Sequence, residues 1–236
     1  MRSWGWWVLV LAILSFSSEI NAQVEATTEH LWFDFYNYFP ITDSLEYDGD
    51  IGFRNAFDEF SWWRVYWRPA LAYKWKRSIR FHGGLKFAFD DYEIGADTFE
   101  LRPYLGIKII WPRVDRFVFR HFLRAEQRLL LNTESDSWTS QFRLRYKLGL
   151  KVPLNNPEMV ERTVYILVSA ELFGNSEGDL EERFASKRRG TVGVGYLFNQ
   201  SWGLEFEYTR QGSRDTRFGG YEGTDNIFHL KAGLHH

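Results

Sequence analysis

The chain has 236 residues, a net charge of −2 and no cysteine. This length fits one domain, and a charge this close to zero points to neither an acidic nor a basic partner. The missing cysteines exclude structural disulfide bonds and a lipid-modified N-terminal cysteine.

Residues 1–22 predict a cleavable secretory signal peptide. Arg2 supplies a basic start, Trp6 to Phe16 form an apolar core, and Ser17 to Ala22 form a polar end that closes on a small residue. Such a segment is removed during export, and we expect cleavage after Ala22. The apolar core is well short of the roughly 20 residues that a membrane-spanning helix needs. Residues 23–236 are therefore predicted to form one exported domain.

The rest of the chain alternates between apolar and polar side chains with a period of two. The pattern is clearest between residues 62 and 151, where Trp63, Val65 and Trp67 alternate with Arg64 and Arg68. Successive side chains of a strand point to opposite faces, so each such segment predicts a strand with one apolar and one charged face. The predicted strands cover residues 30–40, 45–57, 62–76, 79–90, 99–111, 117–131, 138–152, 163–173, 185–198, 202–210 and 227–236.

Long segments of this kind are typical of transmembrane β-barrels, in which lipid-facing and lumen-facing residues alternate. The sequence predicts an all-β, antiparallel barrel of 10–12 strands in the outer membrane of a Gram-negative bacterium. Aromatic residues form 19% of the chain and would supply the interfacial girdles. The alternative is a soluble β-sandwich or lipocalin-like barrel with its apolar face inward.

The strand number follows from a parity rule. Eleven segments can be identified, whereas single-chain bacterial barrels have even numbers of strands. We therefore expect twelve strands, with one more crossing near residues 22–30, or ten if one segment is miscounted. Pro69 and Pro103 fall inside predicted strands. Because the alternation continues past both, we interpret them as local defects.

Charged residues dominate the predicted inward positions. Cations gather on the strands between residues 62 and 152, and acids prevail on the others, so that one wall of the lumen is basic and the other acidic. The candidate lumen-facing residues are Arg64, Arg68, Arg80, Lys86, Arg102, Arg120, Arg124, Glu126, Arg128, Arg143, Arg145, Lys147, Glu171, Arg189, Glu205 and Glu207.

Two functions are compatible with such a lumen. Walls of charge around water would form a narrow passive pore for small polar or ionic solutes. Alternatively, the charges would pair and fill the lumen, giving a non-conducting structural or interaction barrel whose loops at residues 90–98, 175–183 and 212–225 meet an external partner. The expected partners are outer-membrane lipid and, during biogenesis, the barrel-assembly machinery. No nucleic-acid motif is found.

Hairpin counting gives local tests of the two lumen hypotheses. It brings Glu126 near Arg102 and Arg143, which favours pairing. It also brings Glu171 near Lys187 and Arg189. Gly193 and Gly195 should lie across from Glu207 and Glu205, which predicts an open patch there.

A lipid-modifying hydrolase is a further alternative, because such an enzyme could use a Ser-His pair on the outer face of a barrel. Nucleophile and base must lie within hydrogen-bond reach. Counting back from the turn at residues 133–136 puts His121 near Leu148 and Ser140 near Leu129, several residues apart. We therefore assign no catalytic residue. No cluster has metal-ligand spacing, and no cofactor is expected.

Four short runs carry a resemblance to a known family. They are His121-Phe-Leu-Arg-Ala-Glu-Gln-Arg128, Phe142-Arg-Leu-Arg-Tyr-Lys-Leu-Gly-Leu150, Ala170-Glu-Leu-Phe173 and Arg189-Gly-Thr-Val-Gly-Val-Gly-Tyr196. In these runs the chain resembles an uncharacterised family of Gram-negative outer-membrane barrels, known only as a domain of unknown function. Ala170 departs from the Asn expected before the glutamate. The resemblance implies architecture and location, and no activity.

Overall fold

The computed structural model describes residues 27–57, 62–176, 185–215 and 221–235. The predicted signal peptide lies outside these ranges. Among the described residues, no helix is long and apolar enough to cross a membrane. The strands are β1 (Thr27–Pro40), β2 (Leu45–Phe57), β3 (Trp62–Arg68), β4 (Ala70–Lys76), β5 (Ile79–Tyr92), β6 (Thr98–Ile110), β7 (Val118–Asn132), β8 (Ser137–Pro153), β9 (Thr163–Asn175), β10 (Ala185–Leu197), β11 (Trp202–Asp215) and β12 (Tyr221–His235).

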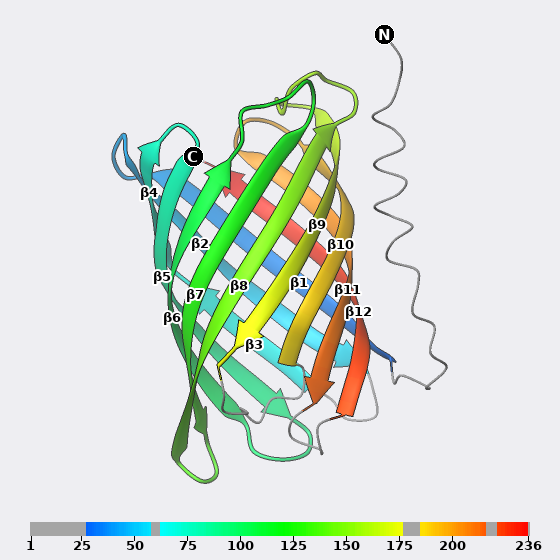
Figure 1. Cartoon of the computed structure of the whole chain (residues 1–236). Coiled ribbons are helices and arrows are strands. Elements are labelled where there is room, and N and C mark those ends of the chain that lie inside the picture. Colours follow the sequence, from blue (N-terminus) through cyan, green and yellow to red (C-terminus); the bar gives the residue numbers. More distant parts are fainter. Residues whose placement is uncertain (1–26, 58–61, 177–184, 216–220, 236) are drawn as a thin grey trace.

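The strands form one closed barrel, which Figure 1 shows from the side. Successive crossings pair antiparallel, and β1 also pairs with β12. β3 and β4 share a single position, because both lie between β2 and β5. The barrel therefore has eleven positions. An up-and-down chain with an odd number of crossings brings its first and last strands together in the same direction, and the β1–β12 seam is indeed parallel, from Thr27 beside Thr224 to Tyr38 beside His235.

The predicted total of twelve strands is confirmed, but its predicted origin is wrong. Thr27 to His30 begin β1 itself, so they do not form the additional crossing that was expected near residues 22–30. The twelfth strand arises instead where Pro69 divides one crossing into β3 and β4. All eleven segments found in the sequence are crossings, and the even-number rule does not hold for this barrel.

Pro69 interrupts the ladder without shifting it. Trp67 pairs with Phe87 before the break and Ala70 pairs with Gly84 after it, so the count continues unchanged. The Leu85 amide donates to the Pro69 carbonyl at 3.1 Å. The return bond is missing because proline has no N–H. Pro103 causes less disturbance, since the β5–β6 register runs through it.

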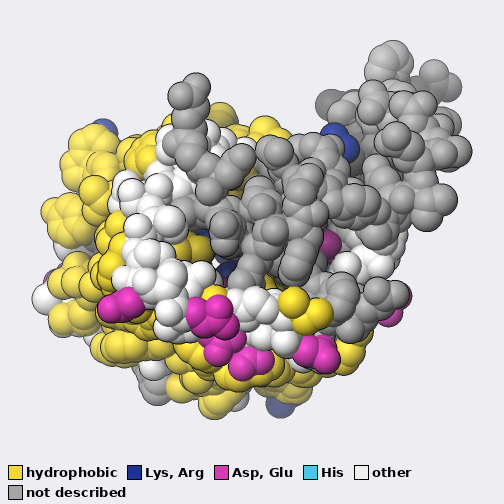
Figure 2. All heavy atoms as spheres, turned by 90° about the horizontal axis from the view of Figure 1, so that it is seen from below, with side chains coloured by type: hydrophobic (Ala, Val, Ile, Leu, Met, Phe, Trp, Pro, Cys, Tyr) yellow, Lys and Arg dark blue, Asp and Glu magenta, His cyan; other side chains and the backbone are white. Residues whose placement is uncertain are grey.

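The two faces of the barrel have opposite character. Large apolar side chains cover the outside: Leu105 is 71% exposed and Trp111 is 55% exposed. Inward side chains are charged, and Glu126 and Arg128 are buried. Seen from one end, the outer rim is largely apolar (Figure 2). The alternative of a barrel or sandwich with its apolar face inward is wrong.

Outward aromatic side chains occur toward both ends of the barrel, as well as between them. We call the end where β1 begins the Thr27 end, and the end where β1 stops the Pro40 end. Trp75 packs on Phe81 at the Pro40 end, with ring centroids 5.8 Å apart. Trp63 packs on Phe89 toward the Thr27 end, also at 5.8 Å. Aromatic side chains toward both ends are typical of barrels that meet two membrane interfaces.

One predicted loop is shorter than expected. The connection assigned to residues 212–225 is partly strand, because β11 continues to Asp215 and β12 begins at Tyr221. The tip of the predicted 175–183 connection lies outside the described residues.

We expect Pro69→Val to stabilise the barrel by about 1 kcal/mol, because the new N–H can donate to the Leu85 carbonyl and complete the ladder. Urea unfolding followed by β-sheet circular dichroism would measure the change. Pro157→Val is the matched control, since Pro157 lies in the connection between β8 and β9. Equal effects of both substitutions would contradict this account of the break.

Candidate functional site

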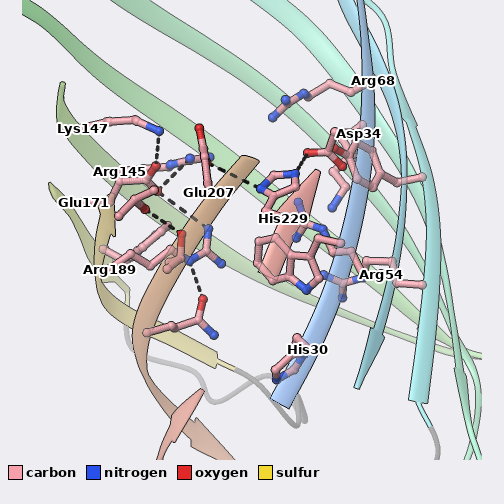
Figure 3. Close-up of a pocket in the computed structure, with 18 of the residues that line it drawn as sticks. His30, Asp34, Arg54, Arg68, Arg145, Lys147, Glu171, Arg189, Glu207 and His229 are labelled. Carbon is pink, nitrogen blue, oxygen red and sulfur yellow. Dashed lines mark hydrogen bonds and ion pairs between the residues drawn. The ribbon is translucent and has the colours of Figure 1, made fainter. Parts of the chain in front are cut away.

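The inward side chains enclose a cavity of about 110 Å³, which gives room for several water molecules. Its lining includes eleven Arg and Lys residues against three acids. Figure 3 shows these side chains converging from several strands. The lining cations are Arg54, Arg64, Arg68, Lys86, Arg102, Arg124, Arg143, Arg145, Lys147, Arg189 and Lys231, and the lining acids are Asp34, Glu171 and Glu207.

Glu126 on β7 is the centre of the largest ion-pair network. Its carboxylate is fully buried and lies 2.6 Å from Arg143, 3.2 Å from Arg124 and 3.5 Å from Arg102. The two predicted pairings of Glu126 are confirmed. Arg102 comes from β6 and Arg143 from β8, the strands that flank β7 in the sheet, and Arg124 lies on β7 itself.

Glu100 extends this network along β6. Its carboxylate lies 2.5 Å from Arg102 and 2.6 Å from the fully buried Arg128. Two carboxylates thus hold four arginines, counting those on Glu126. A carboxylate can accept bonds from several guanidinium N–H groups at once, which is why such clusters can persist in a dry lumen.

Glu171 on β9 carries a second network. It lies 2.8 Å from Arg145, 3.0 Å from Lys147 and 3.7 Å from Arg189 (Figure 3). The predicted proximity to Arg189 is confirmed. The Lys187 side chain lies outside the described part of the chain, so its predicted pairing stays a prediction.

Two further acids form ion pairs with arginine side chains of β3. Asp50 accepts from Arg68 at 2.7 Å and from the Tyr66 hydroxyl at 2.7 Å. Asp90 forms a two-bond ion pair with Arg64. Both arginines were predicted to face the lumen, and each sits beside an acid from a neighbouring strand.

His229 is the member of a cluster near the parallel seam that the sequence analysis did not predict. Asp34 on β1 lies 2.8 Å from His229 on β12, and Glu207 on β11 lies 2.6 Å from Lys231 and 3.7 Å from His229 (Figure 3). Glu207 was predicted to face the lumen. His229 has the inward parity of its strand, so the alternation contained the signal.

Two ion pairs reach across the lumen toward the Pro40 end. Lys108 on β6 lies 3.3 Å from Asp48 on β2, and Lys151 on β8 pairs with Glu205 on β11. In each pair the strands are three positions apart around the barrel. The Tyr165 hydroxyl also donates to Glu205, at 2.6 Å. We call these two ion pairs the crossbars.

The remaining predicted residues differ in their surroundings. Arg80 lies 3.0 Å from Glu46 at the Pro40 end. Arg120 is exposed and has no ion-pair partner among the described residues. Lys86 is 4% exposed and forms no ion pair with a described residue; its ammonium lies 4.6 Å from the centroid of the Tyr66 ring.

The predicted open patch at Gly193 and Gly195 is wrong. Both glycines lie across from Glu207 and Glu205 as counted. However, a Cβ on Gly195 would overlap the ring of Tyr165, and one on Gly193 would meet Glu207. The space that glycine leaves is therefore filled by neighbouring side chains. Tyr66 over Gly52 and Tyr104 over Gly84 repeat the arrangement.

The Ser-His alternative can be compared with the observed register. His121 pairs with Leu148 and Ser140 with Leu129, as counted. His121 Nδ1 lies 2.7 Å from the Tyr146 hydroxyl on the outer face. Among the residues that the structure describes, no group of three or more His, Asp or Glu side chains is placed to hold a metal ion.

A family comparison covers most of this barrel. Residues 29–218 match the family described as "Protein of unknown function (DUF2490)". The chain belongs to this family. The matched region runs from β1 into the connection after β11, so the family domain contains both ion-pair networks and both crossbars. No curated protein matches the chain.

We expect Glu126→Gln to destabilise the barrel by about 3–5 kcal/mol, because it leaves three buried arginines without their shared carboxylate. Urea denaturation of the detergent-solubilised protein would measure this loss. Glu158→Gln is the control: Glu158 also pairs with an arginine, Arg113 at 2.8 Å, but is 58% exposed, and such pairs contribute less than about 1 kcal/mol. A stable Glu126→Gln protein would contradict the network.

We expect Gly195→Ala to cost about 1–3 kcal/mol through overlap with Tyr165. Gly190→Ala on the same strand is the control, since nothing lies within 4 Å of a Cβ built there. Equal unfolding midpoints for the two variants would show that the tyrosine does not fill the space.

Proposed function

We propose that this protein is an outer-membrane β-barrel whose lumen is closed to through passage by the two crossbars. The observation that carries the proposal is the reach of Lys108 to Asp48 and of Lys151 to Glu205, each over three strand positions. Pairs between adjacent strands only line a wall. Pairs that cross the interior occupy the path that a solute would have to take.

The outer surface supports a membrane location. Monomeric soluble proteins rarely expose contiguous apolar patches larger than a few hundred Å². Here, exposed apolar side chains recur on strands all round the barrel, including Phe53, Leu105, Leu144, Val192 and Phe206. Lipid is the partner that such a surface favours, and the barrel-assembly machinery is the expected route of insertion.

The interior supports a closed barrel. Charges removed from water are stabilised only by close and well-directed partners, and most acids of this lumen lie within 4 Å of an Arg or Lys side chain, while Asp34 lies against His229. Glu126 and Glu171 each meet three. These contacts line the wall, and opening a water-filled path would require the two crossbars to separate. The loops would then be the working surface of a structural or interaction barrel, and the chain would not be an enzyme.

A narrow passive pore for small ions is the second candidate. The surplus of cations around the cavity favours it, because a basic wall selects anions. In this alternative the crossbars would act as a constriction that ions pass.

Planar-bilayer recording separates the two candidates. We expect the native barrel to show no stepwise conductance. Replacing both partners of both crossbars by serine (Asp48, Lys108, Lys151 and Glu205) should produce discrete steps, because no charge is left without a partner while the obstruction is removed.

The control replaces the surface pair Arg113 and Glu158 by serine, which should leave the bilayer silent. Discrete steps from the native protein would overturn the closed-barrel proposal and favour the pore. Heat-modifiable migration on gels would establish that each variant is folded.

A further inference from the structure

Lys86 lies on β5 with its side chain in the cavity, and only 4% of the residue is exposed. It forms no ion pair or hydrogen bond with any residue that the structure describes. Its ammonium group lies over the ring of Tyr66 and forms a cation–π contact with it. Removing an ammonium from water costs several kcal/mol. A desolvated cation–π contact contributes about 2 kcal/mol. The Tyr66 ring alone therefore does not offset the cost of burying the Lys86 charge.

Arg54 on β2 is half-buried and likewise forms no ion pair with a residue that the structure describes. Its guanidinium stacks on Trp32 at 3.9 Å and lies 5.0 Å from the centroid of the same Tyr66 ring. Its buried Nε has no hydrogen-bond partner in the described structure. The Lys86 ammonium is 4.6 Å from that ring centroid, so the two charges are no further apart than the sum of these distances.

The neighbours of Lys86 are themselves cations. Arg102, Arg64 and Arg54 all lie close enough to repel it. Glu100 is an acid that attracts it, and Glu100 is already held by Arg102 at 2.5 Å and Arg128 at 2.6 Å.

The whole cavity has the same imbalance. Its eleven lining cations meet three lining acids, and five more acids lie behind the lining, at Asp50, Asp90, Glu100, Glu126 and Asp225. Among the residues that the structure describes, positive charge therefore exceeds negative charge around this cavity. The end-on view in Figure 2, from the Thr27 end, shows Lys and Arg side chains deep in a central hollow.

From this juxtaposition we infer that the cavity binds a phosphate-type oxyanion between Lys86 and Arg54. A tetrahedral oxyanion supplies the negative charge and several acceptor oxygens at once. Arginine presents a fork of N–H donors that suits phosphate, and lysine adds a point charge. Phosphate free in solution and the phosphate group of a larger ester share this chemistry.

The cavity's shape limits the ligand. At about 110 Å³ it is far smaller than the 300–1,000 Å³ typical of sites for drug-sized ligands. The organic part of a bulky phosphate ester would have to lie outside the cavity, toward the Thr27 end. Inorganic phosphate fits entirely inside.

The test is thermal unfolding of the full barrel in detergent, with sodium phosphate replacing sodium chloride at constant ionic strength. A ligand that binds only the folded state raises the melting temperature in a saturable way. We expect this rise for the native protein, and at least a tenfold higher half-saturating phosphate concentration for Lys86→Met. Lys74→Met is the matched control, because Lys74 pairs with Glu46 at 2.7 Å outside the cavity lining.

Three results would overturn the inference: no saturable response in the native protein, an unchanged response in Lys86→Met, or an equal loss in Lys74→Met. Arg54→Gln, expected to weaken the response at least tenfold, carries the test if Lys86→Met does not fold.

Glycerol 3-phosphate serves as the ester probe, and a lower half-saturating concentration for it than for phosphate would identify the ester as the source. The outcome is independent of conductance, since a silent barrel can bind phosphate and a conducting one can fail to do so.

Discussion

The closure of the sheet is the constraint on which the rest of this structure depends. Once β1 pairs with β12, every inward side chain shares one narrow enclosed space. In an open sheet, half of these charges would simply face water. Here they must neutralise one another at hydrogen-bond distance, and the networks around Glu126 and Glu171 are the result. Outward side chains lie outside this enclosed space, and they are apolar.

Acids are the scarce component of the lumen. Single carboxylates serve two or three cations each, and aromatic rings take up part of the remainder, as in the stacking of Arg54 on Trp32. The shortage of acids differs along the barrel axis. Two crossbars lie toward the Pro40 end, while eleven cations and three acids line the cavity. Paired charges and an electropositive hollow thus occur in one lumen.

The sequence predicted what depends on local periodicity. All eleven crossings and their inward parity follow from the alternation with period two, and the pairing of Glu126 with Arg102 and Arg143 follows from counting along single hairpins. Features that depend on the closed shape could not be predicted. Lys151 and Glu205 are 54 residues apart in the chain, and nothing local says that they meet across the interior.

Other misses have local causes. The glycines of β10 leave a space in the alternation pattern, but only the structure shows that Tyr165 fills it. The parity rule failed for a different reason: it generalises from other barrels, and no interaction in this chain requires an even count. A parallel seam uses evenly spaced, slanted hydrogen bonds and is only slightly less stable per residue than an antiparallel one.

The parallel seam would place the start of β1 and the end of β12 on opposite sides of any membrane around the barrel. Because eleven crossings separate them, Thr27 and His235 lie at opposite ends of the barrel (Figure 1). A protease or antibody confined to one side of a membrane would therefore encounter the start of β1 or the finish of β12, never both.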